Sequence, residues 1–268
     1  MKNQPVSTDA GSTRYLIVAT HPQRFVIIAT PRSGSNWLCT LLNSHPDILC
    51  HHELFNPDGV HIAWSLRGSD FDLGGPDLQR EKPLELLNRA WSQSLGHACV
   101  GFKINRGQSE AAFSAVLQDP AIRKILVSRK NRVRAFVSET IAEINGQWES
   151  FPDSPPPTSV QPVTIDPQAL KSHAQANQAY LEEIRQLLDH SGQAFFETYY
   201  ENIGKLNHQH ELLDFLGVEQ NVELKGQTRR MNPEPLESLI QNHDALAAEL
   251  EDTGLADDLI EEQPCDQY

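Results

Sequence analysis

Short apolar runs alternate with amphipathic segments along most of the chain. Runs rich in β-branched residues predict buried strands, and apolar residues spaced three and four apart predict helices. Strands are expected at 25–30, 98–104, 123–128 and 193–199, and helices at 35–43, 83–95, 110–117, 132–147, 167–190, 208–216 and 235–250. This alternation predicts an α/β fold with three layers, in which a mostly parallel sheet carries helices on both faces.

Two segments interrupt the alternation. Residues 50–80 hold several Gly, Asp and Pro without a clear period, which predicts a long loop region. The stretch 149–167 is rich in proline, which excludes regular structure there. With 268 residues, the chain 1–268 is expected to form a single domain, with 1–13 flexible and 251–268 an acidic tail.

A near-repeat opens the chain. Residues 14–22 read RYLIVATHP and residues 24–32 read RFVIIATPR. Only the second copy continues into a loop that contains glycine and then into a predicted helix. The second copy is therefore expected to be the strand that carries a site, and the first is assigned no role in binding phosphate.

Charge and cysteine content narrow the function classes. Acidic residues outnumber basic ones by 36 to 22, and a net charge of −14 argues against a nucleic-acid binder. An anionic ligand would therefore need a local basic pocket. Cys39, Cys50, Cys99 and Cys265 have no paired spacing, which favours free thiols in a reducing compartment. Neither a signal peptide nor a membrane span is expected, so we expect a cytoplasmic protein and no integral membrane partner. A homo-oligomer remains open.

The loop after the second copy is a candidate anion site. In a parallel sheet, ligands bind beyond the carboxyl ends of the strands. A loop between a strand and a helix directs backbone N–H groups and the helix N-terminus at one point. Here Gly34 allows close approach of the backbone, Ser33 and Ser35 add hydroxyls, and Ser33 is also a candidate helix cap. The alternative is a capped turn without a ligand.

The loop departs from the kinase pattern GxxxxGK(S/T). Alignment on Gly34 places Ser35 at the lysine position and Asn36 at the Mg²⁺ ligand. The loop therefore lacks two groups that phosphoryl transfer uses, the lysine that contacts the phosphates and the hydroxyl that binds Mg²⁺. The loop therefore predicts an anion handled without a metal, with Arg32 as the nearby cation.

The sequence TPRSGSNWL at 30–38 resembles the 5′-phosphosulfate loop of the PAPS-dependent sulfotransferases. In that family the loop cradles the 5′-phosphate and sulfonate of 3′-phosphoadenosine 5′-phosphosulfate (PAPS), and the product is 3′-phosphoadenosine 5′-phosphate (PAP). The resemblance implies that Arg32 contacts the leaving phosphate and that no metal takes part. It also implies a donor-binding set of Pro31, Arg32, Ser33, Gly34, Ser35, Asn36 and Trp37.

A second stretch, ILVSRKNRVRAFVSETIA at 125–142, resembles the 3′-phosphate element of the same family. The matching residues are Arg129 and Ser138. A guanidinium at a strand end and a hydroxyl on a helix face supply the charge-assisted donors that a phosphate dianion needs. The alternative is a solvated basic helix start, which the helix dipole disfavours.

Further segments, including HHELF, VGFKI and RRMNPEPLESLIQNHDAL, resemble the bacterial branch that contains the trehalose, lipopolysaccharide and nodulation-factor sulfotransferases. The similarity spans 24–250. It implies an enzyme that transfers a sulfonate from PAPS to a hydroxyl of an acceptor, by in-line displacement without a metal. The implied acceptor is a carbohydrate or a glycolipid.

Glu53 in HHELF is the candidate general base, because the resembled branch places a glutamate there. His51 and His52 are adjacent alternatives, and a surface carboxylate is the structural alternative. A metal site at these three residues is disfavoured, because no further ligand has a suitable spacing.

Other basic residues follow from the resemblance. Lys103 stands at the end of a predicted strand and resembles the lysine that contacts the sulfonate. Asn105 occupies the position of the catalytic histidine in the aryl and steroid enzymes, which strengthens Glu53 as the base. Arg229 and Arg230 correspond to a C-terminal segment that closes over the nucleotide; a pair of exposed arginines is the alternative.

Two other functions are alternatives to sulfonate transfer. They are a P-loop-like kinase of a small molecule or sugar, and a catalytically inactive nucleotide-binding protein. The acceptor itself has no sequence code. The loops 54–80 and 147–165 are expected to contact it, and their aromatic residues would either stack on a sugar or pack as loop core: Trp64, Phe71, Trp148 and Phe151.

Overall fold

A computed structural model describes residues 22–151, 153 and 161–260. The first copy of the repeat up to residue 21, the expected flexible segment 1–13, Cys265 and the last part of the expected acidic tail lie outside the described residues.

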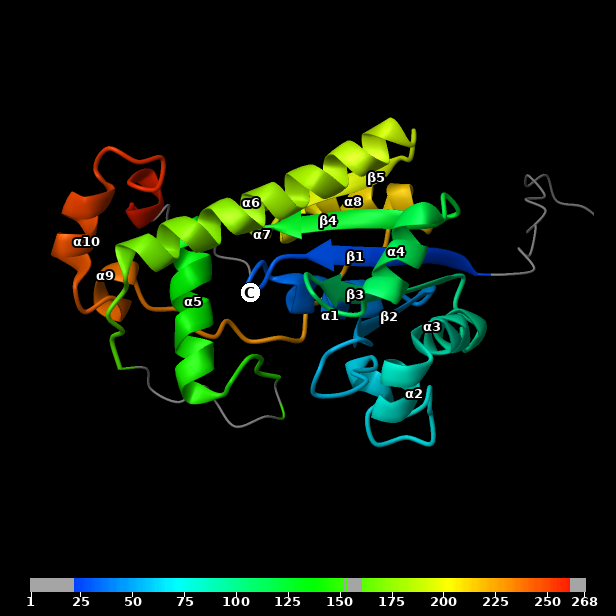
Figure 1. Cartoon of the computed structure of the whole chain (residues 1–268). Helices are drawn as coiled ribbons and strands as arrows, with labels where there is room; N and C mark the ends of the chain where they lie inside the picture. Colours follow the sequence, from blue (N-terminus) through cyan, green and yellow to red (C-terminus); the bar gives the residue numbers. More distant parts are fainter. Residues whose placement is uncertain (1–21, 152, 154–160, 261–268) are drawn as a thin grey trace, which may run out of the picture.

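The centre of the molecule is a sheet of five parallel strands in the order β2-β3-β1-β4-β5 (Figure 1). The strands are β1 (Gln23–Ala29), β2 (Ile48–Glu53), β3 (Cys99–Asn105), β4 (Ile122–Ser128) and β5 (Phe195–Tyr199). β1 is central because its apolar run from Phe25 to Ala29 is completely buried. The predicted α/β class with a parallel sheet is confirmed.

Strand β2 corrects the expectation of a loop from residue 50 onward. It ends in His51, His52 and Glu53, a polar triplet that hides the strand from apolar pattern analysis. Both histidines are nevertheless buried, at 0% and 2% exposure. The same region also contains the short helices η1 (Trp64–Leu66) and α2 (Pro76–Glu81).

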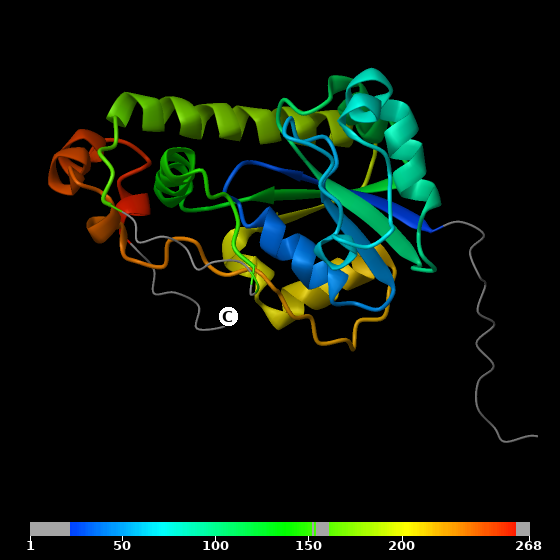
Figure 2. The same cartoon turned by 90° about the horizontal axis from the view of Figure 1, so that it is seen from below.

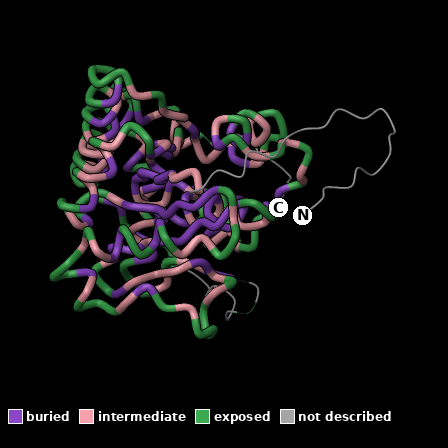
Figure 3. Tube along the Cα trace, turned by 90° about the vertical axis from the view of Figure 1, so that its right-hand side faces the viewer, coloured by how far each residue is buried: buried purple, intermediate pink, exposed green. Residues whose placement is uncertain are grey.

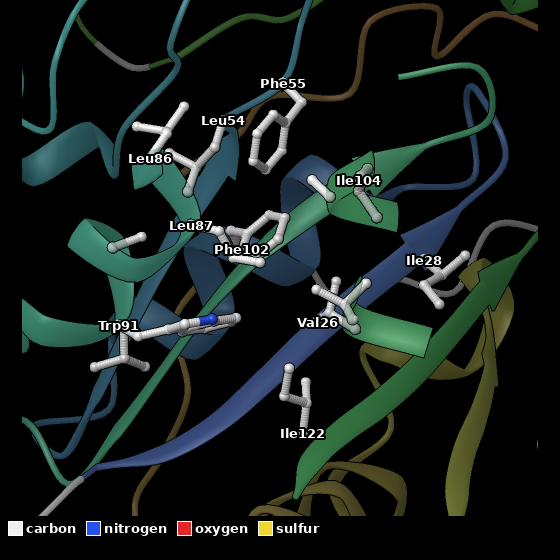
Figure 4. Packing of buried hydrophobic residues seen from close by; sticks show 14 of the residues in the cluster. Val26, Ile28, Leu54, Phe55, Leu86, Leu87, Trp91, Phe102, Ile104 and Ile122 are labelled. Atoms are coloured by element: carbon white, nitrogen blue, oxygen red, sulfur yellow. The ribbon is translucent and has the colours of Figure 1, made fainter. Parts of the chain in front are cut away.

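Helices cover both faces of the sheet (Figure 2). The helices α1 (Ser35–Asn43) and α8 (Leu206–Leu216) pack on one face, where Ile27, Leu42 and Leu213 share a cluster. The opposite face carries α3 (Pro83–Ser92), α4 (Glu110–Gln118) and α6 (Pro167–His190). There Val26 and Ile28 of β1 lie in one cluster with Phe102 and Trp91 (Figure 4). Figure 3 shows the resulting pattern, with the strands buried and the outer helix surfaces exposed.

A third apolar cluster lies beyond the carboxyl ends of the strands (Figure 1). It joins α5 (Arg132–Asn145) and the start of α6 to α9 (Leu236–Leu239) and α10 (His243–Leu250), with η2 (Asp257–Leu259) beside them. The single helix expected at 235–250 is therefore two. The break falls at Ile240 because the chain there is extended and hydrogen-bonds to both sides of Val163.

A four-residue helix, α7 (Tyr200–Ile203), follows β5 directly and was not predicted. Its N-terminal residue stands at the same edge of the sheet as the loop after β1. None of the helices in the described part is both long and apolar enough to cross a membrane.

Gly101 in β3 tests how tightly the sheet packs. A Cβ at this position would lie 2.5 Å from the ring of Phe25. Gly101→Ala is expected to lower the free energy of unfolding by about 1–3 kcal/mol, because the ring must shift in a filled cluster. Gly254→Ala is the control, since no atom lies within 4 Å of its added Cβ. Urea unfolding measures both, and equal stability of the two variants would contradict the prediction.

Candidate functional site

A cavity of about 550 Å³ lies beyond the carboxyl ends of the strands. Residues that follow or end four strands line it: Pro31 after β1, Glu53 in β2, Lys103 in β3 and Arg129 after β4. Tyr200, directly after β5, closes the set. The remaining wall comes from the start of α1, from α5, from the loops 56–58 and 106–108, and from the segments 148–150 and 228–232. The site is thus where the topology of a parallel sheet predicts a ligand.

Nearly all residues expected at the site line this cavity: Pro31, Arg32, Gly34, Ser35, Asn36, Trp37, Glu53, Lys103, Arg129, Ser138, Arg229 and Arg230. Ser33 does not. It is completely buried, and its hydroxyl donates to the Thr30 carbonyl oxygen at 2.7 Å. This corrects the expectation that Ser33 caps the helix: Gly34 is the N-cap of α1, and no side chain caps it.

The loop before α1 requires glycine at position 34 for two reasons. Gly34 has a φ of 78°, in the left-handed region that favours glycine. A Cβ there would also lie 2.4 Å from the ring of Tyr200. Arg32 has a φ of 57° without being glycine, a conformation typical of functional loops. Gly34 and the first residues of α1 line the cavity, and the N-terminus of a helix offers unpaired backbone N–H groups to an anion.

Arg32 joins the two sequence motifs. Its Nε donates to the Ser138 hydroxyl oxygen at 3.0 Å, and its Nη1 donates to the Trp148 carbonyl oxygen at 2.5 Å. Burial, followed by the neighbouring charge of Arg129, lowers the pKa of Arg32 to about 10. Arg32 therefore stays positively charged at neutral pH. Asn232 also donates to the Ser138 hydroxyl oxygen, at 3.1 Å.

The lining is basic although the protein is acidic. Seven cationic side chains face four carboxylates there, in a chain of net charge −14. The cationic residues are Arg32, Lys103, Arg106, Arg129, Arg134, Arg229 and Arg230. This is the local basic pocket that an anionic ligand needs in an acidic protein.

The sequence analysis missed several cavity residues, among them Arg134 and Tyr200. Arg134 donates to the carbonyl oxygens of Asn232 and Glu234, both at 2.8 Å, and so holds the segment 232–234 against α5. Tyr200 lies under Arg129, whose guanidinium carbon is 4.2 Å from the ring centroid. The rule that ligands follow strands points to the position of Tyr200, but no motif marks it.

Glu53 and Lys103 form an ion pair in the wall of the cavity. The Glu53 Oε1 atom lies 2.5 Å from Lys103 Nζ. Lys103 is 3% exposed and also donates to Asn36 Oδ1. The other end of the Asn36 amide donates to Glu149 Oε2 at 3.0 Å. A chain of polar contacts thus runs from the first turn of α1 to the ends of β2 and β3.

The pKa of Glu53 reflects two opposing effects. Burial raises it, but the charge and hydrogen bond of Lys103, with amide hydrogen bonds from Gln108 and Asn56, outweigh burial and lower the pKa to about 2. The carboxylate is therefore ionised throughout the physiological range and balances the charge of Lys103.

The histidine alternatives to Glu53 lie behind the cavity wall. His51 and His52 are both buried and neither lines the cavity. Burial lowers the pKa of His51 to about 4. Burial, and then the charges of Lys103 and Arg67, lower the pKa of His52 well below its ordinary value. Both rings are neutral at pH 7, and Glu53 is the one of the three candidates that reaches the cavity. Over the described ranges, no cluster of three His, Cys, Asp or Glu could hold a metal ion.

The four loop aromatic residues have different surroundings. Trp148 lines the cavity and is 45% exposed. Trp64 instead stacks on Phe151 at 3.7 Å between ring centroids, and Phe71 stacks on His51. Trp148 is thus the one of these four aromatic residues that lines the cavity and is exposed.

We compared the chain with known proteins in sequence and in structure. No family model matches the chain. Nodulation protein H of Rhizobium meliloti strain 1021 is 28% identical over 237 residues, which cover 82% of this chain and 88% of that protein. Nodulation protein H of Rhizobium tropici is 33% identical over 151 residues, covering 52% of this chain and 54% of that protein. A sulfotransferase from Alicyclobacillus acidocaldarius aligns in structure with a TM-score of 0.46 and 15% identity, over 90% of this chain and 94% of that one.

The ion pair of Glu53 predicts a pH-dependent stability. Because the folded pKa is about 2 and the ordinary value is 4.5, the carboxylate stabilises the fold above pH 4.5, and this contribution is lost as the pH falls towards 2. Glu53→Gln is expected to lower the free energy of unfolding by roughly 3 kcal/mol at pH 6, and by progressively less on acidification. Chemical denaturation at several pH values measures this. The exposed Glu85 provides the control Glu85→Gln, which should have a much smaller effect. A loss in Glu53→Gln that does not vary with pH would contradict the prediction.

Proposed function

We propose that this protein transfers the sulfonate of PAPS to a hydroxyl of a carbohydrate or glycolipid. The chain belongs to the bacterial sulfotransferase family that its motifs resemble. The observation that carries the proposal is the hydrogen bond between Arg32 and Ser138. These residues come from two motifs 106 positions apart, and both motifs resemble donor-binding elements of the same family. Their meeting in one basic cavity supports a ligand with anionic groups at both ends.

The cavity suits a nucleotide of this kind. Its volume of about 550 Å³ falls within the range typical of small-molecule sites. The amides at the start of α1, with Arg32, would hold the 5′-phosphosulfate, because both donate to anions. Arg129 and Ser138 would hold the 3′-phosphate. Arg229 and Arg230 line the same cavity and add positive charge on its open side.

The reaction we propose is an in-line displacement at sulfur. The acceptor oxygen forms a bond to sulfur while the bond from sulfur to the 5′-phosphate oxygen breaks, and the acceptor proton passes to Glu53. Arg32 would stabilise the charge on the leaving phosphate, and Lys103 that on the sulfonate oxygens. Each of these side chains lines the cavity in the described structure.

The contacts of Asn36 favour sulfonyl transfer over a kinase reaction. Asn36 replaces the hydroxyl that holds Mg²⁺ in kinases, and both ends of its amide are engaged by Lys103 and Glu149. The site is proposed to work without a metal. A cytoplasmic location belongs to the same proposal, and the buried free thiols Cys39, Cys50 and Cys99 fit a reducing compartment.

Donor identity is testable by calorimetry in the presence of EDTA. PAP is expected to bind far more tightly than AMP or ATP, since each charged hydrogen bond to the 3′-phosphate contributes about 1.5–3 kcal/mol. Arg129→Ala should remove most of this preference, whereas Arg24→Ala, at the opposite end of β1, should leave it intact. Equal affinity for PAP and AMP would contradict the proposed roles of Arg129 and Ser138. Activity that EDTA abolishes and Mg²⁺ restores would favour phosphoryl transfer instead.

Glu53 and Arg32 are expected to give opposite results when binding and turnover are measured separately. Labelled PAPS is first offered to a panel of oligosaccharides and glycolipids, and the best acceptor is used. Glu53→Gln should lower turnover about 10²–10⁴-fold without weakening donor binding, because it removes the proton acceptor and a negative charge, neither of which holds the donor. Arg32→Ala should lower both, because it removes a cation from the donor.

The outcomes of this comparison separate the alternatives. Near wild-type turnover in Glu53→Gln would exclude Glu53 as the base. Donor binding without any transfer in the wild type, over the whole panel, would favour the inactive nucleotide-binding alternative. Circular dichroism of each variant verifies that a loss of turnover does not come from unfolding.

A further inference from the structure

The two oxygens of the Glu53 carboxylate have different surroundings. Oε2 accepts two side-chain amide hydrogen bonds, from Asn56 Nδ2 at 2.8 Å and from Gln108 Nε2 at 2.5 Å. Oε1 lies against the Lys103 ammonium. Asn56 follows β2 and Gln108 follows β3, so the loops after two neighbouring strands converge on one carboxylate oxygen.

Backbone groups set the orientation of both amides. The Asp58 backbone N–H donates to Asn56 Oδ1 at 2.9 Å, and the Asn105 backbone N–H donates to Gln108 Oε1 at 3.1 Å. Because a backbone N–H can only donate, the amide oxygen must face it, and the NH₂ group of each amide must then face Glu53. Gln108 is also 8% exposed, so water competes little for its amide.

Lys103 approaches the other oxygen with capacity to spare. An ammonium group has three N–H donors. Among the described residues, Glu53 Oε1 and Asn36 Oδ1 take two of them. The third donor can face an anionic oxygen in the cavity while the contact to Glu53 persists.

We propose that Asn56 and Gln108 are positioning residues that hold Glu53 by its Oε2 atom and thereby leave Oε1 as the atom that takes the acceptor proton. This inference rests on the proposed function, in which Glu53 is the general base. The two amides prevent rotation of the carboxylate about its own axis, so that Oε1 stays at the Lys103 ammonium and Oε2 stays at the amides. A base held in one orientation meets the acceptor hydroxyl in the geometry that proton transfer needs.

The use of neutral amides has a chemical consequence. Amide donors fix the carboxylate without adding charge near the donor sulfonate, whereas further cations would compete with Lys103. Both amides favour the ionised carboxylate, so each lowers the pKa of Glu53. Removal of either is therefore expected to raise the pKa and loosen the base at the same time.

The test combines a titration that needs no substrate with steady-state kinetics. Infrared difference spectra follow carboxyl protonation from pH 7 down to the lowest pH at which the fold persists, and the band of Glu53 is identified by its absence in Glu53→Gln. In Gln108→Met the titration should move to higher pH. In Gln108→Glu it should move further, because two adjacent carboxylates share one proton.

Kinetics then separate positioning from structural support. Gln108→Met is expected to lower kcat about 10–100-fold, with the KM for PAPS within twofold of wild type. The control is Gln193→Met. Gln193 is also hydrogen-bonded through both amide atoms, to Leu117 and Lys124, but lies before β5 at the opposite edge of the sheet. It should alter stability while leaving kcat and the Glu53 titration unchanged.

Each outcome has a distinct meaning. An unmoved titration in a folded Gln108→Met protein overturns the amide contact, and a moved titration with unchanged kcat overturns the positioning role. If Gln108→Glu fails to fold, Gln108→Met and Asn56→Ala carry the test. Full turnover in Glu53→Gln overturns the general base itself, and this result is recognisable because it does not depend on how the carboxyl band responds to Gln108.

Discussion

The ion pair between Glu53 and Lys103 joins the last residues of two neighbouring strands, and the order of the site depends on it. In regular register His52 would stand opposite Lys103, but a shift between His51 and Glu53 places Glu53 there instead. Such an irregularity re-aims a side chain at the end of a strand. It directs the carboxylate into the cavity and leaves His52 buried. Asn36 of α1 joins the same pair, so three segments are aligned by a single lysine.

Charge distribution links this pair to the rest of the cavity. The protein as a whole repels anions, while the strand ends and α5 gather arginines around one space. Glu53 is balanced by its ion pair with Lys103, and the cationic side chains outnumber the carboxylates in the lining, so the pocket stays positively charged. The field is therefore short-ranged and confined to the cavity, which suits a small anion better than a polyanion.

Prediction from sequence succeeded where local pattern determines structure. The central strand and α1 follow from an apolar run and a glycine loop, and the family motifs pointed to five of the seven cationic residues that line the cavity. The apolar pattern did not predict β2, because the histidines of this strand are buried despite being polar. The helix break at Ile240 was not predicted either, because it depends on hydrogen bonds to Val163, which is distant in the sequence. Tyr200, Asn56 and Gln108 carry no motif, since their roles arise from contacts between loops. A single domain over 1–268 remains a prediction.

The cavity wall has two parts of different origin. One part consists of strand ends held by the buried sheet, with α1 and α5 beside them. The other consists of the irregular segments 148–150 and 228–232, which are joined by the hydrogen bond from the Arg229 N–H to the Ser150 carbonyl oxygen. Substitutions in the second part, where Trp148 is exposed, would not disturb the register of the strands. Arg229 and Arg230 lie in the same part, so only side chains such as that of Trp148, whose backbone oxygen is what Arg32 contacts, are free to change in evolution towards a new acceptor while the recognition of the donor is kept.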